Sequence, residues 1–264
     1  MKAMFNVIIA TAVSACLLLS CSKENSGTTN GKQQVKIYLT DNPVAFQQVN
    51  VDIQKLEIKV EVKDSTGGER EFWETLQIRA GVYNILNFRN GVDTLFAQGL
   101  VTTGEIKKIR ITLGNRNSVM ADSVVYPLLL KKPQVMIDVD DISLINPSAV
   151  KINIDFDACG SIIKINNNSF ELQPRIRTFS DEHDGRIEGK VLPREAAAIV
   201  SVISNGDTLL AIPENDGEFK IRGIKSAVVD VFVNATASGY RDTTLRNVQL
   251  NNREVKLPAI ILQK

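Results

Sequence analysis

Residues 150–158 alternate apolar and polar side chains without a break. The apolar positions are Val150, Ile152, Ile154, Phe156 and Ala158, and the polar positions between them are Lys151, Asn153, Asp155 and Asp157. Successive side chains of an extended chain point to opposite faces. The pattern therefore predicts a β-strand with one face in a hydrophobic core and the other face in water.

The same two-residue period recurs upstream, where it changes parity once. Apolar residues occupy odd positions from Val49 to Ile53 and even positions from Leu56 to Val62. A shift of one residue moves every later side chain to the other face of a sheet. The strand must therefore either bulge at Gln54-Lys55 or cross between two sheets.

Turn signals between the alternating runs predict an all-β fold. Asp64-Ser65-Thr66-Gly67-Gly68 is typical of a hairpin loop, and only residues 83–97 leave a short helix open. The polar run 180–185 contains no apolar anchor and is the expected domain boundary. We predict an antiparallel β-sandwich or barrel over residues 35–180.

After residue 185 the strands become shorter and the turns sharper. Asn205-Gly206 and Asp216-Gly217 are dipeptides typical of tight hairpins, because both turn positions need positive φ. Residues 185–264 are therefore expected to form a second, compact antiparallel β-sandwich.

The N-terminus carries an export signal. An apolar run from Met4 to Leu19 follows one lysine and is too short to span a bilayer. Its end, Leu17-Leu18-Leu19-Ser20-Cys21, resembles a bacterial lipobox, which implies cleavage after a signal peptide of residues 1–20 and lipid on Cys21. Cleavage before Cys16 would shorten the apolar run and leave three leucines after the lipid, and plain secretion after Ser20 is the other alternative.

Residues 21–34 are expected to be a flexible tether that links the lipid to the first domain. The resemblance implies an outer-membrane lipoprotein of the cell envelope, on the periplasmic or the surface face. Ser22-Lys23-Glu24 weakly resembles the acidic surface-export signal of lipoproteins from the Bacteroidota.

Charge and cysteine content exclude two classes of protein. The formal net charge is +1, and cleavage removes Lys2, so the mature chain lacks the positive charge that nucleic-acid binding needs. Of the three cysteines, Cys16 is removed and Cys21 acylated, which leaves Cys159 unpaired and excludes a disulfide framework.

Residues 35–180 resemble the domain of unknown function 4382, a family of lipoproteins without an established activity. The matching stretches are Tyr38-Leu39-Thr40-Asp41-Asn42-Pro43 with Phe46, Val49-Asn50-Val51-Asp52-Ile53, Trp73 with Leu76, Gly104 with Ile109-Arg110-Ile111-Thr112-Leu113-Gly114, Asp155-Phe156-Asp157-Ala158, and Leu172-Gln173-Pro174.

Residues 185–264 resemble the carboxypeptidase regulatory-like fold, a transthyretin-like sandwich. The resemblance lies in Gly185-Arg186-Ile187-Glu188-Gly189-Lys190-Val191, Gly217-Glu218-Phe219 and Ala237-Ser238-Gly239-Tyr240. It implies an accessory stalk or packing module and not a catalyst.

Few residues suit catalysis. His183, the single histidine, lies in the expected linker, where nothing rigid would orient a base. Cys159 has no Cys-x-x-Cys partner and is expected to be an inert packing residue rather than a nucleophile.

Carboxylates offer the only metal-binding chemistry, since calcium takes oxygen ligands. The weak candidates for a calcium site are Asp155, Asp157, Asp138 and Asp140. Asp155 and Asp157 are equally compatible with solvation, or with pairing to basic residues such as Arg110 or Lys151. We expect no catalytic residue, no confident metal site and no cofactor.

Five Asp-Ser/Thr sequences match the O-glycosylation pattern of exported Bacteroidota proteins. Ser65 and Thr243 are the expected sites because both lie at turns, whereas Thr94 is expected to be partly buried. Phe72 and Trp73 are adjacent, so they point to opposite faces of a strand, and glycan binding stays open.

The resulting hypothesis is a non-enzymatic, lipid-anchored binding, adhesion or assembly module. Its partners would be a membrane, through the lipid, and an envelope protein or glycan. The alternative is an envelope hydrolase or metal-dependent enzyme that uses the clustered carboxylates. Three or more carboxylates in one cleft would favour the enzyme, and an exposed apolar patch would favour binding.

Overall fold

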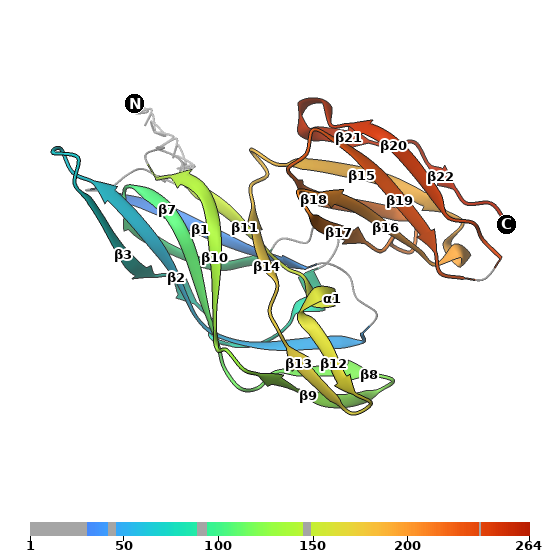
Figure 1. The fold of residues 1–264 in the computed structure, drawn as a ribbon, viewed down its shortest axis with the longest axis horizontal. Coiled ribbons are helices and arrows are strands. Elements are labelled where there is room, and N and C mark those ends of the chain that lie inside the picture. The colour runs from blue at the N-terminus through green and yellow to red at the C-terminus, as the bar shows by residue number, and fades with distance from the viewer. Residues whose placement is uncertain (1–30, 42–45, 89–93, 145–148, 238) are drawn as a thin grey trace, which may run out of the picture.

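A computed structural model describes residues 31–41, 46–88, 94–144, 149–237 and 239–264 (Figure 1). Strands dominate these residues, so the predicted all-β class is confirmed. Two groups of buried apolar side chains are present. We call the strands around the first group the N-terminal lobe, residues 32–179, and those around the second the C-terminal lobe, residues 185–264.

Two sheets enclose the core of the N-terminal lobe. The first has the order β14 (Ile176–Phe179), β11 (Val150–Phe156), β1 (Lys32–Asp41), β6 (Thr94–Thr102) and β4 (Gln77–Ile78). The second has the order β10 (Gln134–Ser143), β7 (Glu105–Leu113), β2 (Gln48–Lys63), β8 (Ser118–Ala121), β9 (Val124–Leu130), β13 (Ser169–Leu172) and β12 (Ile162–Asn166), with β3 (Glu69–Thr75) and β5 (Gly81–Asn84) also paired to β2. The helices are η1 (Ile85–Phe88), inside the ambiguous range 83–97, and α1 (Ala158–Ser161).

The strand predicted from the cleanest alternation, β11, lies near the centre of the first sheet. It pairs with β1 in parallel, with Ile152 opposite Ile37 and Ile154 opposite Leu39. These apolar side chains are fully or almost fully buried. A parallel pair of such distant segments gives the largely antiparallel lobe a mixed sheet.

The parity change in β2 is a bulge, which decides between the two alternatives. The pairing register of β2 with β7 shifts between Ile53 and Lys55, so both halves of β2 turn their apolar residues to the same core. Asp52 holds the turn that follows β7, since Arg116 donates to its carboxylate and its own N–H donates to Asn117.

The C-terminal lobe is a sandwich of two small sheets. One contains β18 (Glu218–Ile224), β15 (Gly185–Leu192), β21 (Glu254–Lys256) and β22 (Ile260–Ile261), and the other has the order β17 (Asp207–Ala211), β16 (Ala198–Ser204), β19 (Val228–Ala235) and β20 (Thr243–Gln249). Short 3-10 helices are η2 (Arg194–Ala196) and η3 (Asn251–Arg253).

The hairpin predicted at Asp64–Gly68 is present, since β2 pairs with β3, and of the two predicted in the C-terminal lobe one is present and one is wrong. Asn205 and Gly206 both have positive φ and connect the paired strands β16 and β17. Asp216-Gly217 also forms a turn, but the strands that it connects, β17 and β18, lie in different sheets. The residues of both turns correctly predict a turn, but they do not specify whether the strand after the turn pairs with the strand before it or crosses to the other sheet.

Candidate functional site

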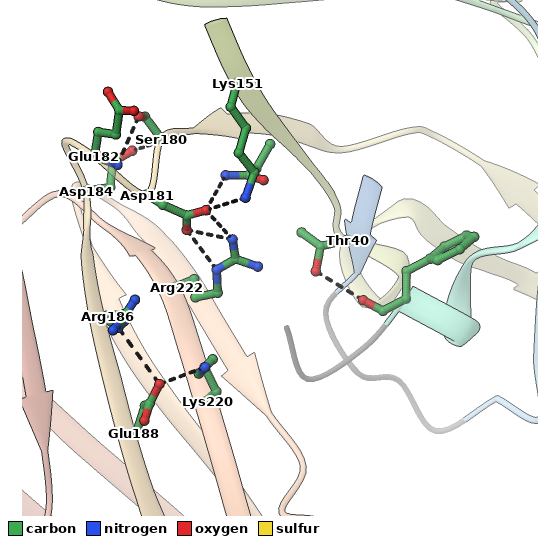
Figure 2. A network of polar contacts seen from close by, with 12 residues as sticks. Thr40, Lys151, Ser180, Asp181, Glu182, Asp184, Arg186, Glu188, Lys220 and Arg222 are labelled. Atoms are coloured by element: carbon green, nitrogen blue, oxygen red, sulfur yellow. Dashed lines mark hydrogen bonds and ion pairs between the residues drawn. The ribbon is translucent and has the colours of Figure 1, made fainter. Parts of the chain in front are cut away.

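The two lobes meet at a joint centred on Asp181, in the turn between β14 and β15 (Figure 2). Arg222 of β18 donates to both carboxylate oxygens of Asp181, with its Nη2 2.6 Å from Oδ1 and 2.7 Å from Oδ2. Lys151 and Asn153 of β11 donate to Oδ2 at 2.9 and 3.2 Å. One carboxylate therefore connects a strand of each lobe.

These contacts determine the protonation state of Asp181. Burial alone would raise the pKa of this carboxyl, but the hydrogen bonds and positive charges of Arg222 and Lys151 outweigh it and lower the pKa to about 2. The carboxylate is therefore ionised over the ordinary pH range and its charge is balanced within the joint.

A second set of contacts surrounds the buried ring of Phe179. The guanidinium groups of Arg177 and Arg222 lie 5.5 and 5.0 Å from the ring centroid. Arg177 also donates to the backbone carbonyls of Gly223 and Arg222. β14 is thus joined to β18 by side-chain contacts and not by strand pairing.

The polar face of β11 is buried at two positions, which corrects the prediction of a wet face there, whereas Lys151 on the same face is exposed. Asn153 is 0% exposed and Asp155 is 2% exposed. The neighbouring strand β14 brings Arg177 over Asp155, with Nη2 2.6 Å from Oδ2, and Arg177 itself packs on the C-terminal lobe. Burial raises the pKa of Asp155 against the opposing effect of Arg177.

The partners proposed for Asp155 were also wrong. Arg110 pairs with Glu57 and stacks over Trp73, and Lys151 pairs with Asp181. Alternation indicates which face of a strand a residue occupies, but not which strand lies beside it. The sequence therefore did not identify Arg177 as the partner of Asp155.

The other calcium candidates do not gather at one site: two of them interact with different groups, and the side chain of the third is not described. Asp157 caps α1 by accepting from the Gly160 N–H, and Asp138 of β10 pairs with Lys108 of β7. The side chain of Asp140 lies outside the described part of the chain. Among the described residues, no group of three or more histidine, cysteine, aspartate or glutamate side chains is arranged to hold a metal ion.

His183 and Cys159 differ in how well they match expectation. His183 is exposed in the turn between the lobes, but its own N–H and that of Asp184 donate to the Ser180 carbonyl, so the turn is more ordered than predicted. Cys159 is exposed in α1, so its expected packing role is wrong. Loss of hydration, with the nearby carboxylates of Asp157 and Asp41, raises the pKa of its thiol and disfavours the thiolate.

Some of the predicted modification sites lie in the described residues and others lie outside them. Cys21, Cys16 and the signal peptide lie outside the described residues. Ser65 and Thr243 are exposed, but so is Thr94, which contradicts its expected burial. No helix in the described part of the chain has the length and apolar character needed to cross a membrane.

A groove lies along the edge of β10, beside the joint. Two adjoining cavities of about 580 and 490 Å³ share Val135, Met136, Pro174 and Arg175. The larger cavity extends to Lys131, Lys132 and Glu171. The smaller one reaches residues 206–208, in the β16–β17 hairpin of the C-terminal lobe, so both lobes form its walls.

Sequence reasoning identified neither the joint nor the groove. Arg177, Asp181 and Arg222 are isolated charges in the sequence, and only tertiary packing brings them within hydrogen-bonding distance. The available signal was the charge within the polar run 180–185, which we interpret as a domain boundary.

Comparison with known proteins gives one family match. Residues 32–174 match the family described as Domain of unknown function (DUF4382). No curated protein is significantly similar to the chain.

Among solved structures, pilin subunits are similar at low scores. A mutant of the shaft pilin SpaA from Lactobacillus rhamnosus GG is 8% identical, covers 88% of this chain and 97% of its own, and has a TM-score of 0.27. BcpA, the major pilin subunit of Bacillus cereus, is 13% identical, with 88% and 70% covered and a TM-score of 0.25. The group B streptococcus pilus 2b backbone protein is 11% identical, with 88% and 92% covered and a TM-score of 0.24. These scores lie below the level that indicates a shared fold.

Proposed function

The chain belongs to the family of the domain of unknown function DUF4382, and because that description names no activity, we propose a function from the geometry of the chain itself. We propose a lipid-anchored protein of the cell envelope, on the periplasmic or the surface face of the outer membrane. In this proposal its two lobes act as a non-enzymatic binding, adhesion or assembly module, and the C-terminal lobe is the accessory carboxypeptidase regulatory-like unit.

The observation that carries this proposal is the joint between the lobes. Its ionisable groups form ion pairs, Asp155 with Arg177 and Asp181 with Arg222. Partly buried ion pairs contribute little net stability, but they do fix geometry, because each charge needs its partner in place. Groups arranged in this way support a role in holding two binding surfaces in one orientation, rather than a role in proton transfer.

The anchor is tested by changing the cysteine of the lipobox. Cys21→Ser should move the protein from the membrane fraction to the soluble fraction, because no acyl chain could then be attached. Cys16→Ser is the matched control and should stay with the membrane. Equal retention of the two variants in membrane pellets from the native host would overturn the anchoring proposal.

The binding role is tested by purifying the mature protein with its partners from native envelopes, after mild cross-linking. A partner recovered in fixed stoichiometry would support a module of binding or assembly. Turnover of envelope substrates by the purified protein would contradict the proposal.

We place the O-linked sugars first on Ser65 and Thr243, which face solvent in the two different lobes.

A further inference from the structure

β12 is an edge strand that has both of its faces in solvent. In the described part of the chain it pairs only with β13, and no other described strand lies along its outer side. Both strands lie at the lower end of the N-terminal lobe (Figure 1). Residues 163–166 are all exposed, so neither face of this part of the strand is covered. An edge strand in this state can accept a further strand.

The register with β13 determines which backbone groups of β12 are open. The N–H of Gln173 donates to the carbonyl of Ser161, so these two residues form a hydrogen-bonded pair of the ladder. Such pairs alternate along antiparallel strands, and the next one is Ile163 with Glu171. The N–H and C=O groups of Lys164 therefore point away from β13, toward the position of an added strand.

One face at this edge is apolar. Ile163 and Ile165 are 36% and 55% exposed, and Leu129 of β9, which lies on the same face, is 57% exposed. Glu171 lies between Ile163 and Leu129, but its carboxylate already binds Lys131 at 2.6 Å. This face therefore offers side-chain contacts to an added strand, in addition to the main-chain bonds of the edge.

The other face carries a positive charge without an opposite charge. Lys164 is the charged residue of β12, and it forms no ion pair with any residue that the structure describes. Its neighbour across the strand pair is Phe170, and the acidic residue of β13, Glu171, is on the opposite face. Asp41 and Asp157 lie at α1, where each accepts a backbone hydrogen bond from that helix. Lys164 is therefore available to a carboxylate of the added strand.

This charge disfavours a second copy of the chain as the occupant. When two β12 strands overlap over their whole length, antiparallel or in parallel, the two copies of Lys164 lie opposite each other. Like charges directly opposite each other destabilise a strand pair, whereas opposite charges stabilise it. Charge complementarity therefore favours a segment of another protein that has an acidic residue at this position.

We propose that β12 is the docking edge for an extended segment of a partner protein, in which an acidic residue stands between two apolar residues. The inference rests on the proposed binding function and specifies its site and its class of partner. The segment adds a strand antiparallel to β12, which is the more stable direction of pairing. Its carboxylate pairs with Lys164, and its two apolar side chains pack beside Ile163 and Ile165.

The first test measures charge selection with the mature chain and a labelled peptide of sequence Thr-Val-Glu-Val-Thr. Binding is followed by fluorescence anisotropy, and a peptide with lysine in place of glutamate is the comparison. Wild type should bind the glutamate peptide about tenfold more tightly than the lysine peptide, and Lys164→Glu should reverse this order. Arg194→Glu changes the net charge equally at an exposed residue of the C-terminal lobe, and it should keep the wild-type order.

The second test separates the apolar face from the backbone. Ile165→Thr should weaken binding of the glutamate peptide by about fivefold, because it removes apolar contact area. Ile203→Thr is the matched control and should leave binding unchanged, since Ile203 is also 55% exposed but belongs to β16, which has a strand on each side. N-methylation of the glutamate amide should abolish binding, because that N–H donates to the Lys164 carbonyl in the proposed register, whereas N-methylation of the first valine should not.

Several results would overturn the proposal. They are an unchanged peptide preference in Lys164→Glu, equal effects of the two methyl groups, and equal binding by Ile165→Thr and wild type. Sedimentation of the chain without peptide should show a monomer, and a dimer that Ile165→Thr dissociates would mean that a second copy occupies the edge. Failure of the glutamate peptide to bind a protein that does recover a partner from native envelopes would overturn this inference and leave the proposed binding function intact.

Discussion

Single residues at the joint show how context changes the meaning of a charge. Asp155 and Asp181 are both aspartates paired to arginine, yet burial raises the pKa of Asp155 whereas Arg222 and Lys151 lower that of Asp181 to about 2. One oxygen of each of the buried side chains Asn153 and Asp155 has no hydrogen-bond partner among the described residues. The joint therefore incurs a desolvation cost that the contacts of Asp181 and Arg177 offset.

The pH dependence of stability should report on Asp181. Its folded pKa, about 2, lies below the ordinary value of 3.8, so its contribution is present above pH 3.8 and is lost as the pH falls through 2. Asp181→Asn should lower stability at neutral pH by about 1 kcal/mol, since solvent screens part of the interaction. The difference from wild type in thermal melts should shrink below about pH 3.

Asp122→Asn is the matched control, because Asp122 is exposed in a turn of the N-terminal lobe. Its melting curve should follow that of wild type at every pH. A constant difference between Asp181→Asn and wild type from neutral pH to about pH 2 would contradict the assigned role.

Gly223 tests the packing of the same joint. Its φ is +74°, and an added Cβ would lie 2.7 Å from Arg177 Nη1 and 2.9 Å from Phe179 Cγ. Gly223→Ala should therefore destabilise the protein by about 2 kcal/mol, through backbone strain and collision together.

Gly206→Ala separates these two causes. Gly206 has φ +87° and nothing lies within 4 Å of an added Cβ. The Gly206→Ala substitution should therefore lower the free energy of unfolding through backbone strain alone, by about 1 kcal/mol. Chemical denaturation of both variants gives the comparison. Equal losses would mean that the joint accommodates the methyl group.

At the scale of elements, β2 and β11 illustrate what alternation does and does not specify. In β2 the parity change is absorbed by a bulge, and both halves face one core. In β11 the apolar side chains face the core as expected, but two of the polar side chains, Asn153 and Asp155, are buried as well, whereas Lys151 is exposed. Alternation identifies the face with the greater hydrophobicity, and neighbours decide whether the other face meets water.

Deletion of Gln54 tests the bulge. Without the extra residue, the apolar side chains from Leu56 onward would share the parity of those from Val49 to Ile53, so a strand without a bulge would turn all of them to the core. The N-terminal lobe should therefore keep its cooperative unfolding transition, because the apolar side chains of β2 stay buried and only the contacts of Gln54 itself are lost.

Insertion of one glycine between Ser65 and Thr66 is the control, since it alters the chain length in an exposed hairpin turn. That variant should unfold cooperatively with a similar midpoint. A Gln54 deletion that unfolds without a cooperative transition would show that the core requires the bulge itself and contradict this account.

At the scale of the whole molecule, the two lobes are joined by charge and aromatic contacts rather than by a shared core. The two clusters of buried apolar residues are separate, and Asp181 with Arg222 lies between them. Arg253 also donates to the carbonyl of Glu182, so the turn is fixed from a second side. The orientation of the lobes, and the wall that residues 206–208 add to the groove, depends on these contacts.

Proteolysis tests this dependence. Arg222→Ala removes the contacts of Arg222 with Asp181 and Phe179 and should expose the turn. A glutamate-specific protease should then cut after Glu182 faster than in wild type, and should release two fragments that each keep β-rich circular dichroism. Arg246→Ala removes an exposed pair with Asp230 elsewhere in the C-terminal lobe and is the control.

The prediction would fail if wild type, Arg222→Ala and Arg246→Ala were cut after Glu182 at the same rate. Fragments that unfold once separated would show that the lobes need each other, and the proposed division into two independent domains would then be wrong.

The sequence by itself determined the all-β class, the core face of β11 and the two alternatives for β2. It also located the Asn205-Gly206 hairpin. These features depend on interactions within a few residues, namely the two-residue period of an extended chain and the positive φ that a tight turn requires.

Only the tertiary structure decided which strands lie together. The parallel pairing of β1 with β11 joins segments more than a hundred residues apart, and Arg177 reaches Asp155 only because β14 pairs with β11. Many pairings of similar strands satisfy the same alternation, and the choice among them rests on how the whole core packs. The burial of Asp155, the joint at Asp181 and the charged groove beside β10 follow from that choice, so no local pattern specified them.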